Sequence, residues 1–119
     1  MKDSEINGFL LDTTAIIDFF RGSKHVAALL ETIKNKGLLA SCPVTIAETF
    51  AGARESENKK VHEFLSSLVF YPFTYESARL AGRWRYSYAR KGIILSLSDT
   101  LIAALAVENR LALVTANKR

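Results

Sequence analysis

The segment FLLDTTAIIDFF, residues 9–20, places an aspartate at the end of an apolar run and two threonines directly after it. The apolar residues before Asp12 indicate a buried strand, whereas an aspartate is seldom buried without a partner. Two explanations are open for this carboxylate. It either caps the start of a helix, or it holds a metal ion.

Short apolar segments alternate with amphipathic helices along the chain. We expect strands at 8–12, 38–42, 70–73 and 111–114, with Pro72 placing 70–73 at an edge of the sheet or at the end of the strand. A further apolar run lies at 93–97, and we expect it to lead as a strand into the helix that follows. Helices are expected at 13–21, 26–37, 45–54, 61–69, 76–91 and 98–109. This alternation is typical of a parallel sheet covered on both faces, so the sequence predicts an α/β fold of three layers, α/β/α, in a single domain spanning residues 1–119.

Composition limits the classes of function. The chain has 119 residues, of which 49% are hydrophobic and 24% charged, which is typical of a globular protein. Cys42 is the only cysteine, so an intrachain disulfide and a cysteine zinc cage are excluded, and we expect a cytoplasmic location. No secretory signal and no apolar run of about 20 residues is visible, so no membrane association is expected. The net charge of +4 favours a polyanionic partner such as nucleic acid.

Three acidic residues are expected near the carboxyl ends of the strands. Asp12 ends the first strand, Glu48 is expected in the first turn of the helix after the second strand, and Asp99 opens the helix after the run ILSLS. Ligands of parallel sheets bind beyond this edge. Clustered carboxylates repel one another and require a cation, and oxygen ligands alone favour Mg²⁺ or Mn²⁺.

Each acid also has a structural explanation. Asp12 is a suitable N-cap residue, and the spacing of Thr45 and Glu48 matches a capping box. Asp99 is favourable near the positive end of a helix dipole. What favours the joint site is the shared position of the three acids in the fold, together with the apolar residues that flank Asp12 and Asp99.

The helix expected at 76–91 carries a basic face. No acidic residue occurs from 77 to 98. Basic residues interleaved with aromatic ones suit phosphate contacts and base stacking on single-stranded RNA. The alternative is a solvated helix face with Trp84 and Tyr88 in the core. The residues that share the basic face are Arg79, Arg83, Tyr86 and Arg90.

The segments FLLDTTAIIDFF, TIAETFAGA and LSLSDTLIAALAVENRLALVTAN, in this order and at these separations, resemble the PIN-domain family, and within it the small VapC-type toxin ribonucleases. The likeness covers nearly the whole chain. It implies a PIN-like α/β/α fold with a central parallel sheet. By comparison with the family, the C-terminal tail of this chain is expected to be short or truncated.

The resemblance carries over residue by residue. Asp12, Glu48 and Asp99 fall on the acids that hold the divalent metal in the family, and Thr13 falls on a hydroxyl that supports the site. Asn117 falls on a fourth catalytic position, where many relatives have aspartate. The amide oxygen can still ligate a hard cation but contributes no charge, which puts a second metal in doubt.

The function implied is that of a metal-dependent endoribonuclease, the toxin of a toxin-antitoxin pair. Its partners would be an RNA substrate, a cognate antitoxin protein and a second copy of the chain, and Arg79 and Arg83 are candidates for contact with the RNA. The alternative is a degenerate PIN domain that binds RNA or a partner without cutting. A phosphate-accepting receiver domain is disfavoured, because it needs adjacent acids after its first strand and Asp12 stands alone there.

Overall fold

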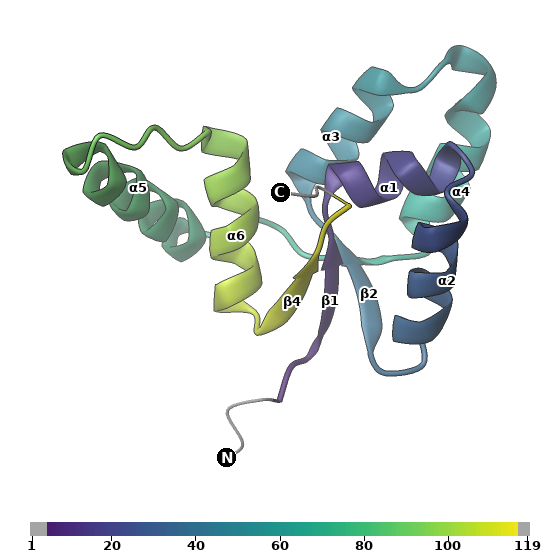
Figure 1. Cartoon of the computed structure of the whole chain (residues 1–119), viewed down its shortest axis with the longest axis horizontal. Helices are drawn as coiled ribbons and strands as arrows, with labels where there is room; N and C mark the ends of the chain where they lie inside the picture. The colour runs from purple at the N-terminus through teal and green to yellow at the C-terminus, as the bar shows by residue number, and fades with distance from the viewer. Residues whose placement is uncertain (1–4, 117–119) are drawn as a thin grey trace.

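Four parallel strands form the centre of the molecule in a computed structural model that describes residues 5–116 (Figure 1). The strand order is β3-β2-β1-β4, and every neighbouring pair is parallel. The predicted α/β fold with a central parallel sheet is therefore confirmed. The strands are β1 (Gly8–Leu11), β2 (Leu38–Ser41), β3 (Val69–Phe70) and β4 (Leu111–Val114).

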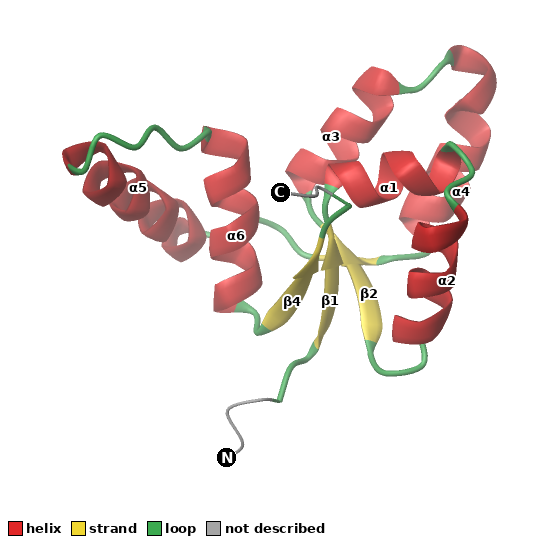
Figure 2. Cartoon of the chain, viewed as in Figure 1, coloured by secondary structure: helices red, strands yellow, loops and turns green. Residues whose placement is uncertain are grey.

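Helices cover both faces of this sheet (Figure 2). Helices α1 to α4 lie on one side, and α6 lies on the other with α5 packed against it (Figure 1). The helices are α1 (Thr13–Phe20), α2 (Lys24–Ile33), α3 (Pro43–Gly52), α4 (Asn58–Ser66), α5 (Tyr75–Arg90) and α6 (Leu97–Glu108), with a short 3₁₀ turn, η1, at Glu55–Glu57.

Strand β1 is buried on both faces, which explains its uninterrupted apolar sequence. Leu11 packs in one cluster with residues of α1, α2 and α4, such as Ile16 and Leu30. Leu10 points to the opposite face and packs in a second cluster with Leu105 of α6. The strand that ends at Asp12 is thus fixed from both sides, so the position of this carboxylate is set by the core.

Several sequence predictions about element boundaries are wrong. The strand expected at 70–73 is Val69–Phe70, and the helix expected at 61–69 is Asn58–Ser66. Residues 93–96 form no strand, and α6 begins at Leu97 with Ser96 as its N-cap. Pro43 starts α3 at its first position, where the missing N–H costs nothing, so this helix begins two residues earlier than expected. The edge position predicted from Pro72 is confirmed, because β3 is an edge strand and ends before Pro72.

Within residues 5–116, no helix combines the length and apolarity needed to cross a membrane.

Candidate active site

Asp12 lies directly after β1 and is the N-cap residue of α1. Its Oδ1 accepts hydrogen bonds from the backbone N of Ala15 at 3.0 Å and from Thr14 Oγ1 at 2.7 Å. The capping explanation is therefore confirmed, but it uses only one carboxylate oxygen. No residue from 5 to 116 donates a hydrogen bond to Oδ2, so capping and ligand binding are compatible at this residue.

Thr14 links Asp12 to the segment that follows β4. Its hydroxyl donates to Asp12, so it acts as acceptor for Thr115 Oγ1 at 3.1 Å and for the backbone N of Ala116 at 3.1 Å. A hydroxyl has one proton and two lone pairs, and all three are used here. The carboxylate and the chain after β4 are thereby held in one arrangement.

Glu48 lies in the second turn of α3 rather than in the first, because the helix begins at Pro43. Its Oε1 accepts a hydrogen bond from Thr13 Oγ1 at 2.6 Å, across 35 positions of sequence. The capping box predicted with Thr45 is wrong. Buried Thr45 instead pairs with the backbone of Cys42, the N-cap residue, which leaves Glu48 exposed at the edge of the sheet.

Asp99 lies in the first turn of α6. Its backbone N donates to Ser96 Oγ at 3.0 Å, whereas its exposed carboxylate has no hydrogen bond or ion pair to any residue from 5 to 116. The prediction that Asp99 follows a strand is wrong. Because α6 leads into parallel strand β4, its first turn still lies toward the edge of the sheet where β1 ends (Figure 1).

One hydrogen bond, from the Thr13 hydroxyl to Glu48, connects the residue after Asp12 to α3. Asp99 lies on a separate wall formed by α6, and within residues 5–116 no three His, Cys, Asp or Glu side chains form a group that could hold an ion. Asn117, the fourth predicted catalytic residue, lies outside the described residues.

The two predicted arginines of α5 differ in their surroundings. Arg79 forms an ion pair with Glu76 at 2.9 Å, and this hydrogen bond and the nearby negative charge raise the pKa of the guanidinium. The guanidinium of Arg83 lies 5.2 Å from the centre of the Tyr86 ring, and that of Arg90 lies 4.5 Å from it. Arg83 thus has no neutralising partner among the described residues and remains the stronger candidate for phosphate contact.

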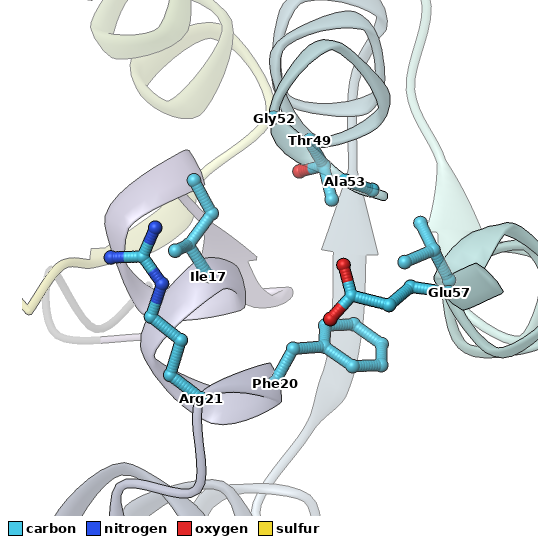
Figure 3. Close-up of a pocket in the computed structure, with 8 residues that line it drawn as sticks. Ile17, Phe20, Arg21, Thr49, Gly52, Ala53 and Glu57 are labelled. Carbon is cyan, nitrogen blue, oxygen red and sulfur yellow. The ribbon is translucent and has the colours of Figure 1, made fainter. Parts of the chain in front are cut away.

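The structure has a large groove beside α5 and a small cleft beside α1. The groove, of about 700 Å³, separates α5 from the start of α6, with Asp99 and Trp84 among its lining residues. Trp84 is only half buried and Tyr88 is exposed, so the place in the core predicted for both is wrong. A second cleft, between α1, α3 and η1, measures only about 40 Å³; Figure 3 shows Arg21 and Glu57 at its borders. That volume holds a few water molecules, so the small cleft is no substrate site.

Comparison with known protein families identifies the family to which the chain belongs. The family model described as PIN domain matches residues 9–119. The chain belongs to the PIN-domain family. Ribonuclease VapC19 of Mycobacterium tuberculosis is 38% identical over 113 residues, which cover 92% of this chain and 89% of that protein. The predicted resemblance to VapC-type proteins is confirmed.

Solved structures of toxin-antitoxin complexes share this PIN fold. A toxin-antitoxin complex from Klebsiella pneumoniae contains a chain that is 27% identical, with a TM-score of 0.79, over 92% of this chain and 87% of that one. A DNA-bound VapBC complex from Salmonella typhimurium gives 25% identity and a TM-score of 0.81, over 94% and 88% of the two chains.

Proposed function

We propose that this PIN domain is the toxin of a VapBC-type pair and that it hydrolyses RNA phosphodiester bonds. The observation that carries the proposal is the position of Asp12 directly after β1, beside Thr13, whose hydroxyl donates a hydrogen bond to Glu48 of α3. The name of the relative from Mycobacterium tuberculosis, a ribonuclease, supports the same chemistry.

The reaction proposed requires a divalent cation, Mg²⁺ or Mn²⁺. The donors fit such an ion in kind, because they are carboxylate oxygens and Asp12 and Asp99 have oxygens with no partner among residues 5–116. In this proposal Asp12 and Asp99 would hold the metal, and Glu48 would ligate it through water or help to position the nucleophile. When bound, the ion neutralises charge on the phosphate and lowers the pKa of a bound water.

The protein side chains contribute orientation and charge. Thr13 fixes one oxygen of Glu48, which leaves Oε2 directed by that bond and available to a water or ligand. The Ala15 backbone and Thr14 fix Oδ1 of Asp12 in the same way. Asn117 would add a neutral amide oxygen, which can orient water without adding charge. Two carboxylates are thus oriented before substrate arrives, which reduces the ordering required in the transition state.

The RNA backbone needs positive charge near these carboxylates. Arg83 is our first candidate for a phosphate contact, because the structure gives it an aromatic neighbour and no carboxylate partner among the described residues. Arg79 is the second, since its pairing with Glu76 is exposed and therefore weak.

We also propose two protein partners. The solved complexes of similar fold support a cognate antitoxin, since one is a toxin-antitoxin complex and another a VapBC complex. A second copy of the chain is proposed as well. Exposed apolar side chains such as Phe70 of the edge strand β3, which is 52% exposed, are compatible with a protein partner.

The test is cleavage of a mixed pool of structured cellular RNAs by the purified chain without antitoxin. Mg²⁺ or Mn²⁺ is supplied in one set of reactions and EDTA in another. The Asp99→Asn variant controls for contaminating nuclease, and Asp18→Asn provides an equal change of charge on α1 at a residue outside the site. We expect discrete cleavage sites that require the metal and Asp99 but survive Asp18→Asn.

Absence of cleavage together with retained RNA or partner binding would instead establish the degenerate binding module. That outcome would direct attention to Asn117, the neutral residue at the fourth position.

A further inference from the structure

The groove between α5 and α6 has features that the carboxylate site does not explain. Its lining combines two aromatic side chains, Trp84 and Tyr88, with the apolar residues Ile94 and Leu95. Its volume of about 700 Å³ lies within the range of sites for small organic groups. The open side faces solvent, since Tyr88 is 41% exposed and Ile94 is 84% exposed.

Local contacts hold this groove open in a defined shape. Arg85 Nε donates a hydrogen bond to the backbone oxygen of Leu95 at 3.0 Å, which ties the segment after α5 to the helix itself. Gly92 adopts a φ of 80°, which turns the chain at the end of α5. Helices α5 and α6 pack against each other, so the aromatic side chains of α5 have a fixed place relative to Asp99.

A cation lies beside the aromatic side of the groove. Lys91 lies with its Nζ 5.5 Å from the centre of the Tyr88 ring, which lines the groove. Arg83 and Arg90 lie over Tyr86 on the same helix, and Tyr86 is not a lining residue. Asp99 is the acidic residue of the lining. An apolar peptide would gain nothing from Lys91, whereas a nucleotide has both an anionic phosphate and a flat ring that stacks on aromatic side chains.

The position of Asp99 connects the groove to the reaction. Asp99 lines the groove and is also a proposed metal ligand. We propose that this groove is a subsite for an unpaired nucleobase of the RNA substrate, stacked against Trp84 and Tyr88 next to the bond that is cut. This inference rests on the proposed ribonuclease function, because it assigns a part of that substrate to a second surface.

Trp84 is the only tryptophan of the chain, so its fluorescence reports on this groove alone. The full chain is titrated with a single-stranded hexauridylate in EDTA, which prevents metal-dependent cleavage. A second titration uses an oligomer of equal length and charge whose central nucleotides lack bases. We expect saturable quenching by hexauridylate and none by the abasic oligomer.

Variants of Tyr88 separate stacking from simple apolar contact. Tyr88→Leu keeps apolar volume but removes the ring, and it should weaken hexauridylate binding about 5- to 100-fold, the range that one stacked base contributes. Tyr88→Phe should bind within about twofold of the natural chain, because the stacking face is retained. Tyr75→Leu is the matched control, since this exposed tyrosine lies at the other end of α5, about 20 Å away along the helix.

Three results would overturn the inference. Equal quenching by the abasic oligomer would show that only phosphate binds near Trp84. Quenching that Tyr88→Leu leaves unchanged would place the base elsewhere. A tryptophan signal that responds to protein concentration but not to RNA would make the groove a contact between copies of the chain.

The subsite and the proposed function fail separately. Cleavage of the RNA pool without quenching by any oligomer would refute the subsite alone. Quenching that requires bases, in a chain that cuts no RNA, would refute the nuclease alone.

Discussion

The two walls of the proposed site are built differently. On one wall, hydrogen bonds from three parts of the chain fix Asp12 and Glu48: Thr13 joins α1 to α3, and Thr14 joins α1 to the segment after β4. On the other wall, the cap at Ser96 fixes the backbone of Asp99, but nothing in residues 5–116 fixes its carboxylate.

This difference indicates how the site is ordered. The first wall is in place before any ligand binds, because each bonded oxygen already has its partner. The second wall has a carboxylate that is free to reorient and a neighbouring groove that is open to solvent. A cation and a nucleotide would therefore complete the site mainly on the α6 side.

The largest predicted effect tests whether both walls serve one reaction. Asp12→Asn and Asp99→Asn should each reduce RNA cleavage about 100-fold or more, because interactions with a catalytic metal contribute several kcal/mol and each 1.36 kcal/mol is a factor of ten. The measurement is the initial rate of cleavage at saturating metal. Asparagine caps helices well, so thermal unfolding of Asp12→Asn should stay close to that of the natural chain. Full cleavage by Asp99→Asn would show that Asp99 on α6 takes no part in the reaction.

A smaller effect is expected when the first wall is loosened without removing an acid. Thr14→Val keeps the side-chain shape but removes the hydroxyl that connects Asp12 with Thr115 and Ala116. Loss of such an orienting partner typically costs about 10- to 100-fold in activity or metal affinity. Metal titration and cleavage rate measure both.

Thr14→Ser retains the hydroxyl and should recover most of the activity lost in Thr14→Val. Equal losses in the valine and serine variants would show that packing of the methyl group, rather than the hydrogen bonds, is what the site needs.

Two buried hydroxyls near the start of α3, those of Thr45 and Ser41, can be compared by their effect on the free energy of unfolding. Thr45 bonds the backbone N and O of Cys42 at the start of α3, whereas Ser41 Oγ has no hydrogen-bond partner among residues 5–116. Thr45→Val should lower the free energy of unfolding by about 1–3 kcal/mol, because it leaves a buried N–H unpaired. Ser41→Ala should change it by less than about 1 kcal/mol, since no hydrogen bond is lost. Chemical denaturation checks both, and an equal loss in the two variants would contradict this reasoning.

The smallest effect is expected at the cap of the second wall. Ser96→Ala removes the acceptor for the backbone N of Asp99 and should cost about 1 kcal/mol of stability. Ser96→Asp should restore the cap, because aspartate is an equally good N-cap residue. Thermal unfolding distinguishes the two variants. An unfolding temperature that neither variant changes would show that the first turn of α6 is held by packing instead.

Much of the site was predictable where local sequence sets local structure. The apolar run before Asp12 and the alternation of segments predicted strand, helix and parallel sheet, because burial on two faces leaves a continuous apolar sequence. The boundaries at Pro43 and at 93–97 were misjudged. A proline starts a helix as readily as it ends a strand, and an apolar run beside a groove resembles a buried strand.

The sequence by itself determined the fold class, the family and the acids that end up near the carboxyl edge of the sheet, because these follow from periodicity and from motifs of adjacent residues. Only the tertiary structure decided that Thr13 bonds Glu48 and that Trp84 lines a groove instead of the core. Such contacts depend on the packing of whole elements against one another. The spacing of residues along one segment does not specify that packing.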